Sequence, residues 1–263
     1  MKLFKSMILC SVGALMTLFS GCSDWLDVNV DPENPTAGNA TYDSRLAHIE
    51  FLYQQVPLSL LLWRSSMSMG DWTRYYDGGT YWNMSYWSPQ TGAVTTPYQW
   101  WFCGAAVNIP FLIDKATAAE AWHYVGAARV IRAYGFMLMT DLYGEMPYKS
   151  SEAEAGVTPT YNDGKTIYLA VWPILTPLSR CSKKEQGSAT ASLAVGDIWN
   201  GGSVDKWLKL AYLLKARYIN KLIKKGEGSY LEGKYDAAEI LACLDKAQQS
   251  NADNTVFNHI DAN

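Results

Sequence analysis

The sequence is poor in the residues and motifs from which catalytic sites are built. It contains only three histidines in 263 residues, and His48, His123 and His259 are not spaced like metal ligands. It has no P-loop, no dinucleotide-binding fingerprint and no nucleophile elbow. Asp141 and Glu145 lie one helical turn apart, as a glycosidase pair could, but carboxylates near a helix end are usually solvated. We therefore expect a protein that is not an enzyme and that uses no metal or cofactor.

Charged residues are also scarce, at 18% of the chain, and the net charge is −3. Because there is no excess of basic residues, we do not expect nucleic acid as a partner. Hydrophobic residues make up 49% and aromatic residues 13%. A chain of this length and composition can bury a sizeable core, as one large domain or two small ones.

The apolar stretch at residues 7–19 is too short to cross a membrane. As a helix it would rise only about 20 Å, whereas the hydrocarbon core of a bilayer is about 30 Å thick. The stretch follows a short basic segment and ends in Ser20-Gly21-Cys22, which is the arrangement of a lipoprotein signal. We expect residues 1–21 to be removed as the signal peptide and Cys22 to be acylated, which anchors the chain stably. The alternative is ordinary signal cleavage nearby.

The cysteines do not form a disulfide framework. Of the five, Cys10 lies in the signal peptide and Cys22 is the expected lipidation site. The odd and widely spaced trio of Cys103, Cys181 and Cys243 also fits no zinc motif. We interpret these three as buried thiols, and one disulfide with a free third thiol is the alternative.

Strand-like alternation is missing, and helical periodicity dominates. Residues 22–44 contain two prolines and several Asp and Asn residues, so we expect an extended tether there. Ser203 is a predicted helix N-cap, and Asn162 or Asp163 is another. The sequence predicts an all-α domain at residues 45–263, in which helix pairs pack side by side. Its expected helices lie at residues 45–69, 98–115, 119–143, 163–181, 204–225 and 235–248.

Several segments, taken in order, resemble the SusD/RagB family of outer-membrane nutrient-binding lipoproteins of Bacteroidetes. The resemblance implies tetratricopeptide-like helix pairs with long irregular loops. It also implies a surface-exposed position at the outer membrane, with a SusC-like TonB-dependent β-barrel transporter as partner. The segments are Cys22-Ser-Asp-Trp-Leu-Asp-Val-Asn, Asp31-Pro-Glu-Asn-Pro-Thr36, Ala127-Ala-Arg-Val-Ile-Arg-Ala-Tyr134, Thr140-Asp-Leu-Tyr-Gly-Glu-Met-Pro147, Pro159-Thr-Tyr-Asn-Asp163, Gly196-Asp-Ile-Trp-Asn-Gly-Gly202 and Trp207-Leu-Lys-Leu-Ala-Tyr-Leu-Leu-Lys-Ala-Arg217.

This chain departs from the family pattern in two respects. Tyr212 stands where the family's helix commonly has Asn. Family members are also considerably longer, so we expect this chain to correspond to an N-terminal half. The resemblance therefore says less about the ligand site, because the other half normally supplies much of that surface.

Residues 70–97 are predicted to form a long irregular loop, and seven Trp and Tyr residues lie within sixteen positions of it. Indole and phenol rings stack on the apolar C–H faces of sugars, while amide groups bond the sugar hydroxyls. The alternative is that these rings fill the core beneath the loop. The candidate ligand-binding residues are Trp72, Tyr75, Trp82, Asn83 and Trp87.

From these observations we expect a non-catalytic lipoprotein that binds a nutrient at the cell surface and works with the transporter. The expected ligand is an oligosaccharide, and peptide is the second ligand class. The rival hypothesis is a helical-repeat lipoprotein that docks proteins without contacting a nutrient, in which the loop aromatics are core or interface anchors.

Overall fold

The computed structural model describes residues 40–57, 92–148, 159–175 and 181–258. The chain divides into two units after Ala40, and the fold described below is that of the second unit. Its longer helices are α3 (Tyr42–Pro57), α6 (Gly92–Gln99), the π-helix η2 (Trp100–Ala106), α7 (Val107–Ala118), α8 (Trp122–Tyr143), α9 (Gly164–Leu175), α11 (Val204–Asn220) and α12 (Ala237–Leu244). Short 3-10 turns lie at Leu193–Val195, Ile223–Lys225, Tyr230–Glu232 and Asn251–Asp253.

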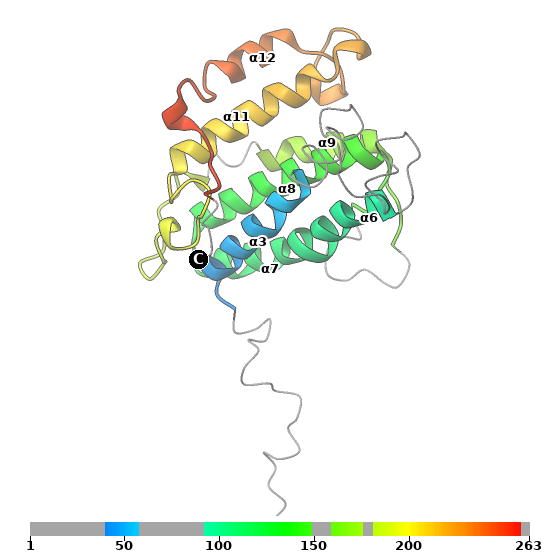
Figure 1. Ribbon diagram of the computed structural model, residues 1–263. Coiled ribbons are helices and arrows are strands. Elements are labelled where there is room, and N and C mark those ends of the chain that lie inside the picture. Colours follow the sequence, from blue (N-terminus) through cyan, green and yellow to red (C-terminus); the bar gives the residue numbers. More distant parts are fainter. Residues whose placement is uncertain (1–39, 58–91, 149–158, 176–180, 259–263) are drawn as a thin grey trace, which may run out of the picture. The chain divides into compact units, whose positions relative to one another are not determined.

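The central element is α8, which packs against α3, α7, α9 and α11 (Figure 1). Because it has neighbours on several sides, most of its residues are buried rather than a single stripe. Small residues such as Gly126, Ala127 and Ala128 let these neighbours approach closely. The helix ends where Gly144 takes a φ of 75°, a conformation that glycine adopts without strain.

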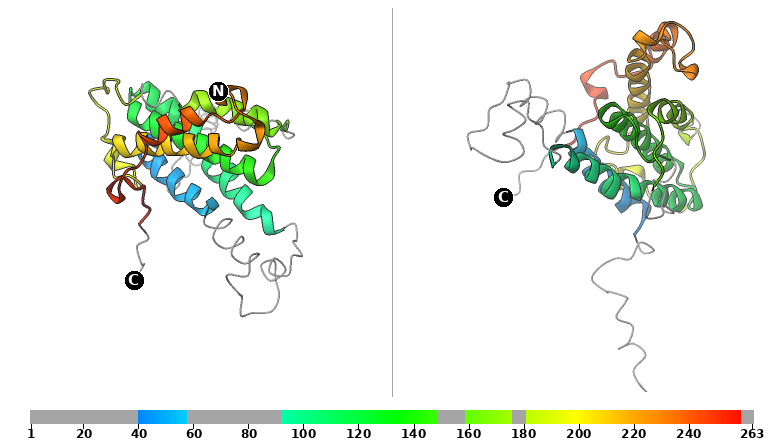
Figure 2. Two further views of the ribbon diagram at one scale, coloured as in Figure 1. Left: turned by 90° about the horizontal axis from the view of Figure 1, so that it is seen from above. Right: turned by 90° about the vertical axis from the view of Figure 1, so that its right-hand side faces the viewer.

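Successive helices form pairs, α7 with α8, α8 with α9, and α11 with α12 (Figure 2). The predicted all-α architecture of packed helix pairs is therefore confirmed. The predicted caps are confirmed as well: Ser203 accepts a hydrogen bond from the backbone N–H of Lys206 (3.3 Å), and Asp163 accepts one from that of Thr166 (2.9 Å). The helix predicted at 119–143 is α8, which begins at Trp122.

Other helix boundaries were predicted less well. The first helix begins at Tyr42, so the last residues of the range expected to be a tether are helical. The helix expected at 98–115 lies within a longer helical stretch, which runs from Gly92 to Ala118 and contains a π-helical segment. That segment ends at Ala106, four residues before Pro110, whose ring nitrogen has no hydrogen to donate to the Ala106 carbonyl. Helix α11 ends at Asn220 rather than at residue 225.

The tightest packing in the core joins η2 to α8. The indole of Trp101 is fully buried and makes edge contacts with Tyr53 and Phe136, at centroid distances of 5.6 and 5.3 Å. It lies directly over Gly135, where a Cβ atom would come within 1.9 Å of the ring. A glycine is therefore required at this position of α8, since no side chain fits beneath the indole.

Within the described ranges, β-type pairing is limited to two isolated bridges, Met146 with Asn162 and Glu227 with Tyr235. None of the helices in the same ranges combines the length and the apolar character needed to span a membrane.

Candidate binding site

A buried carboxylate organises the loop at residues 196–202, which joins the short turn Leu193–Val195 to α11. Asp197 is only 3% exposed, and its oxygens accept hydrogen bonds from four N–H groups. The donors are the backbone amides of Trp199 (3.1 Å), Asn200 (2.8 Å) and Gly202 (2.9 Å) and the indole Nε1 of Trp207 (2.8 Å). The loop is thus folded around one carboxylate, and this fixes the backbone that carries the Trp199 side chain.

A second buried carboxyl group joins this loop to α3. Glu50 is fully buried, and its Oε2 accepts a hydrogen bond from the backbone N–H of Ile198 (2.7 Å). Burial and then the negative charge of Asp197 raise the pKa of Glu50 to about 9. Glu50 is therefore protonated and uncharged at neutral pH. A neutral Glu50 can stand close to Asp197 without adding a second charge.

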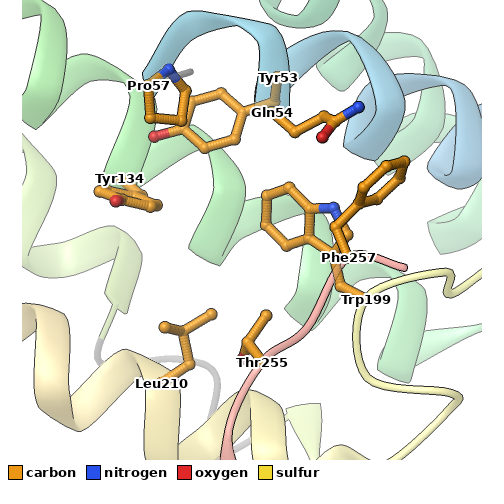
Figure 3. Close-up of a pocket in the computed structure, with 8 residues that line it drawn as sticks. All are labelled: Tyr53, Gln54, Pro57, Tyr134, Trp199, Leu210, Thr255 and Phe257. Atoms are coloured by element: carbon orange, nitrogen blue, oxygen red, sulfur yellow. The ribbon is translucent and has the colours of Figure 1, made fainter. Parts of the chain in front are cut away.

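A cavity of about 240 Å³ lies beside this loop (Figure 3). Segments far apart in the sequence contribute to it: α3, α8, the Asp197 loop, α11 and the chain that follows the turn Asn251–Asp253. In Figure 3, the α3 residues lie opposite Leu210 and Thr255, with aromatic rings on both sides between them. The lining residues are Tyr53, Gln54, Pro57, Tyr134, Trp199, Leu210, Thr255 and Phe257.

The aromatic walls of the cavity support one another. The ring of Tyr53 contacts those of Tyr134 and Trp199, at centroid distances of 5.2 and 5.7 Å. The indole of Trp199 in turn stacks on that of Trp207, with centroids 5.9 Å apart and planes inclined by 22°. Since Trp207 also donates to Asp197, the wall and the loop are held by one connected set of contacts.

Three polar atoms on the lining residues are buried and have no hydrogen-bond partner among the described residues. They are the Tyr53 hydroxyl, the Trp199 Nε1 and the Thr255 hydroxyl. Buried polar groups in native proteins are nearly always hydrogen-bonded to protein, water or ligand. Burial also raises the pKa of Tyr53 well above its usual value, so its phenol stays protonated and can donate. These atoms lie within the walls rather than on the surface of the cavity, because each is itself shielded from solvent.

Residues 61–263 match the model of a SusD-like family that is described as "Starch-binding associating with outer membrane". This chain belongs to the SusD-like family. No curated protein matches the chain.

Solved structures share the SusD-like fold of this chain. A SusD/RagB family protein from Bacteroides thetaiotaomicron is 20% identical with a TM-score of 0.68, and the match covers 85% of this chain and 46% of that one. The Bacteroidetes AC2a SusD-like protein is 19% identical with a TM-score of 0.59, covering 85% and 40%. A further SusD-like protein from Bacteroides thetaiotaomicron is 20% identical with a TM-score of 0.51, covering 78% and 42%. This chain thus spans less than half the length of these SusD-like proteins.

The site residues predicted for this SusD-like chain lie outside the described residues. These are the lipidation site Cys22 and the loop residues Trp72, Tyr75, Trp82, Asn83 and Trp87. Sequence reasoning did not identify the cavity. The segment Gly196-Asp-Ile-Trp-Asn-Gly-Gly202 was the available signal, since an Asp side chain in a turn-rich segment often accepts hydrogen bonds from nearby backbone N–H groups.

The structure also describes the two carboxylates and three of the cysteines that were considered in the sequence analysis. Asp141 pairs with the Lys221 ammonium group, and Glu145 is exposed. Among the described residues of this SusD-like chain, no cluster of three or more His, Cys, Asp or Glu side chains could hold a metal ion. Cys103, Cys181 and Cys243 form no disulfide. The interpretation as buried thiols is confirmed for Cys181 and Cys243 but is wrong for Cys103, which is exposed on its helix.

Proposed function

We propose that this chain is a non-catalytic, lipid-anchored subunit that binds an oligosaccharide at the cell surface and delivers it to a TonB-dependent outer-membrane transporter. The observation that carries the proposal is the family match over residues 61–263, because that family is described as starch-binding and associated with the outer membrane. The anchor is Cys22. Trp72, Tyr75, Trp82, Asn83 and Trp87 contact the glycan by stacking and hydrogen bonding.

The chemistry of the described residues supports binding rather than hydrolysis. A glycosidase needs two carboxyl groups that face the same substrate. The cavity is lined by no acidic residue at all. Of the carboxylates considered above, Asp141 is paired with Lys221 and Asp197 is fully occupied by N–H donors. Binding through rings and neutral polar groups requires neither a proton donor nor a nucleophile.

Titration with maltoheptaose and a panel of other oligosaccharides tests glycan binding by the mature chain. We expect saturable binding to at least one glycan, and we expect Trp82→Ala to lose about tenfold or more in affinity with unchanged circular dichroism, because stacking on one ring contributes on this scale. The control is Tyr212→Ala. If no glycan binds and a peptide panel does, the ligand class is peptide; if neither binds, the proposal is wrong.

One observation favours the rival function of a protein-docking module. Helix α12 exposes apolar side chains on its outer face, with Leu241 65% and Leu244 42% exposed. Exposed apolar residues that gather on one helix are typical of interaction surfaces. Under this hypothesis Leu241→Lys abolishes a protein partner while Trp82→Ala has no effect on any ligand. Retained partner binding in Leu241→Lys contradicts a docking role for this face.

A further inference from the structure

An aromatic side chain is exposed just before the start of α9. Tyr161 is 59% exposed, although an aromatic ring of this size normally stabilises a protein by being buried. It precedes Asn162, which forms the isolated bridge with Met146. Its neighbours in the chain, Thr160 and Asn162, are both polar. The exposed ring is therefore a single apolar surface between polar residues.

The backbone that carries Tyr161 is fixed by the residues that follow it. Asn162 exchanges two backbone hydrogen bonds with Met146, of 2.9 and 3.2 Å, and its side-chain oxygen accepts one from the N–H of Tyr148 (3.3 Å). Asp163 then caps α9. The protein thus sets the position of this tyrosine without a ligand.

The side chain of Tyr161 is also held at its tip. Burial and then the interaction with the Tyr161 hydroxyl raise the pKa of Tyr98 to about 12, so the Tyr98 phenol is uncharged at neutral pH. The ring of Tyr98 contacts those of Phe102 and Tyr143, at centroid distances of 4.3 and 5.6 Å. Phe102 in turn contacts the buried Phe136. Tyr161 is therefore the exposed end of a group of aromatic rings that reaches the core.

A ring that is held in place but left open has the properties of a preformed stacking surface. Holding a side chain in one position costs conformational entropy, and at Tyr161 little apolar burial offsets that cost. A ligand that stacks on the open part of the ring does not have to order it first, which favours affinity.

The surroundings of the ring fit a sugar better than a protein. A stable protein interface covers about 800 Å² on each partner and has an apolar core of several residues. The exposed Leu241 and Leu244 on α12 are of this kind, whereas Tyr161 is one ring between polar neighbours. One sugar ring matches one phenol, because its apolar C–H face stacks on the ring while its hydroxyls stay hydrated.

Two further observations favour a glycan at this position. The family that matches residues 61–263 is described as starch-binding. In addition, Tyr98, which contacts Tyr161, directly follows in the chain the range 70–97 that holds the candidate glycan-binding residues.

We propose that Tyr161 is a glycan-stacking residue, in addition to those of the aromatic loop at residues 70–97. A sugar ring lies with its C–H face against the exposed phenol ring. The inference rests on the proposed function, since it assumes that the protein binds glycans.

The test compares a variant that lacks the ring with one that lacks only the hydroxyl. Tyr161→Ala should lower glycan affinity about fivefold, because stacking on one phenol ring contributes on this scale. Tyr161→Phe keeps the ring and should bind within about twofold of the wild type. A purely structural role through Tyr98 predicts instead that both variants lose affinity equally, since both lose the hydroxyl that contacts Tyr98.

The matched control is Leu231→Ala. Leu231 is also 59% exposed, and it lies on the 3-10 turn Tyr230–Glu232. This variant should bind glycan as the wild type does, because it removes an equally exposed apolar side chain elsewhere on the surface. Circular dichroism and thermal melts of all three variants verify that the fold is intact.

The probes are maltoheptaose and the same oligosaccharide panel, titrated by calorimetry into the full mature chain and each variant. We expect at least one oligosaccharide to bind more weakly to Tyr161→Ala, and to bind Tyr161→Phe and Leu231→Ala nearly as it binds the wild type. The inference is overturned if Tyr161→Ala binds every oligosaccharide as the wild type does. It is also overturned if Tyr161→Ala and Tyr161→Phe lose affinity equally.

The same titrations separate this inference from the proposed function. If an oligosaccharide binds in a manner that depends on Trp82 but not on Tyr161, the inference is wrong and the protein is still a glycan-binding subunit. If no oligosaccharide binds the wild type, the proposed function itself is wrong, and the inference falls with it.

Discussion

Replacing Glu50 by Gln should remove a strong pH dependence of folding stability. Gln has the same shape, can accept from the Ile198 N–H through its amide oxygen, and is neutral at every pH. Wild-type Glu50 has a pKa of about 9 in the folded chain, raised by burial and by the charge of Asp197, against 4.5 without these influences. Between these values the folded state holds a proton that the unfolded state releases, so the free energy of unfolding falls as the pH rises.

The size of the effect follows from the proton difference. One proton corresponds to about 1.4 kcal/mol per pH unit, so from pH 5.5 to 7.5 the wild type should lose roughly 3 kcal/mol of stability through Glu50 alone. The Gln variant lacks this loss. Its stability relative to the wild type should therefore increase by about the same amount over the same interval, while all other groups cancel in the comparison.

Urea unfolding followed by tryptophan fluorescence at pH 5.5, 6.5 and 7.5 measures this difference directly. The control is Glu145→Gln, an exposed carboxyl group on the same protein, which should follow the wild-type pH profile. Parallel profiles for the wild type and Glu50→Gln would refute the reasoning, because they would mean that Glu50 is ionised in the folded protein.

Three further predictions concern the core, the loop and the thiols. Gly135→Ala should lower the free energy of unfolding by about 3 kcal/mol, since the new methyl group collides with the Trp101 indole. The control is Gly104→Ala, whose methyl group meets only the flexible Leu52 side chain at 3.2 Å. A melting temperature of Gly135→Ala close to that of the wild type contradicts the prediction. Asp197→Asn should lower the free energy of unfolding measured in urea by about 3 kcal/mol, because an amide cannot accept from all four N–H donors and places its own NH₂ against some of them. A loss below about 1 kcal/mol would mean that the charge is dispensable. A thiol reagent should label the exposed Cys103 in the native protein, and it should label the buried Cys181 and Cys243 only after unfolding. Burial is also the main cause that raises the pKa of Cys243 to about 11, which lowers its reactivity further. Rapid labelling of Cys181 or Cys243 in the native protein contradicts the packing.

Local signals in the sequence account for what was predicted correctly. The caps at Ser203 and Asp163 depend on side chains within three residues, and the end of α8 depends on periodicity and on Gly144. These features are visible without any knowledge of what packs where. The all-α class follows from the same periodicities.

The features that the sequence did not predict, the cavity and the burial of Glu50, depend on contacts between distant segments. The cavity joins Tyr53 to Thr255, two residues separated by most of the chain, and no pattern in either neighbourhood indicates the other. Glu50 looks like any helix-surface acid in the sequence, and only the approach of the Asp197 loop buries it. The end of α11 at Asn220 was also missed. The residues that follow are compatible with an α-helix by propensity, but they form i→i+3 hydrogen bonds and the 3-10 turn Ile223–Lys225 instead.

Native mass spectrometry of the protein purified in detergent from the cell envelope, after growth on a binding glycan, tests the central claim most directly. The account predicts a chain acylated at Cys22, in complex with a β-barrel transporter, and a mass increment equal to an intact oligosaccharide that disappears in Trp82→Ala. An acylated chain that carries a protein partner but never a glycan, in the wild type as in the variant, would contradict the account.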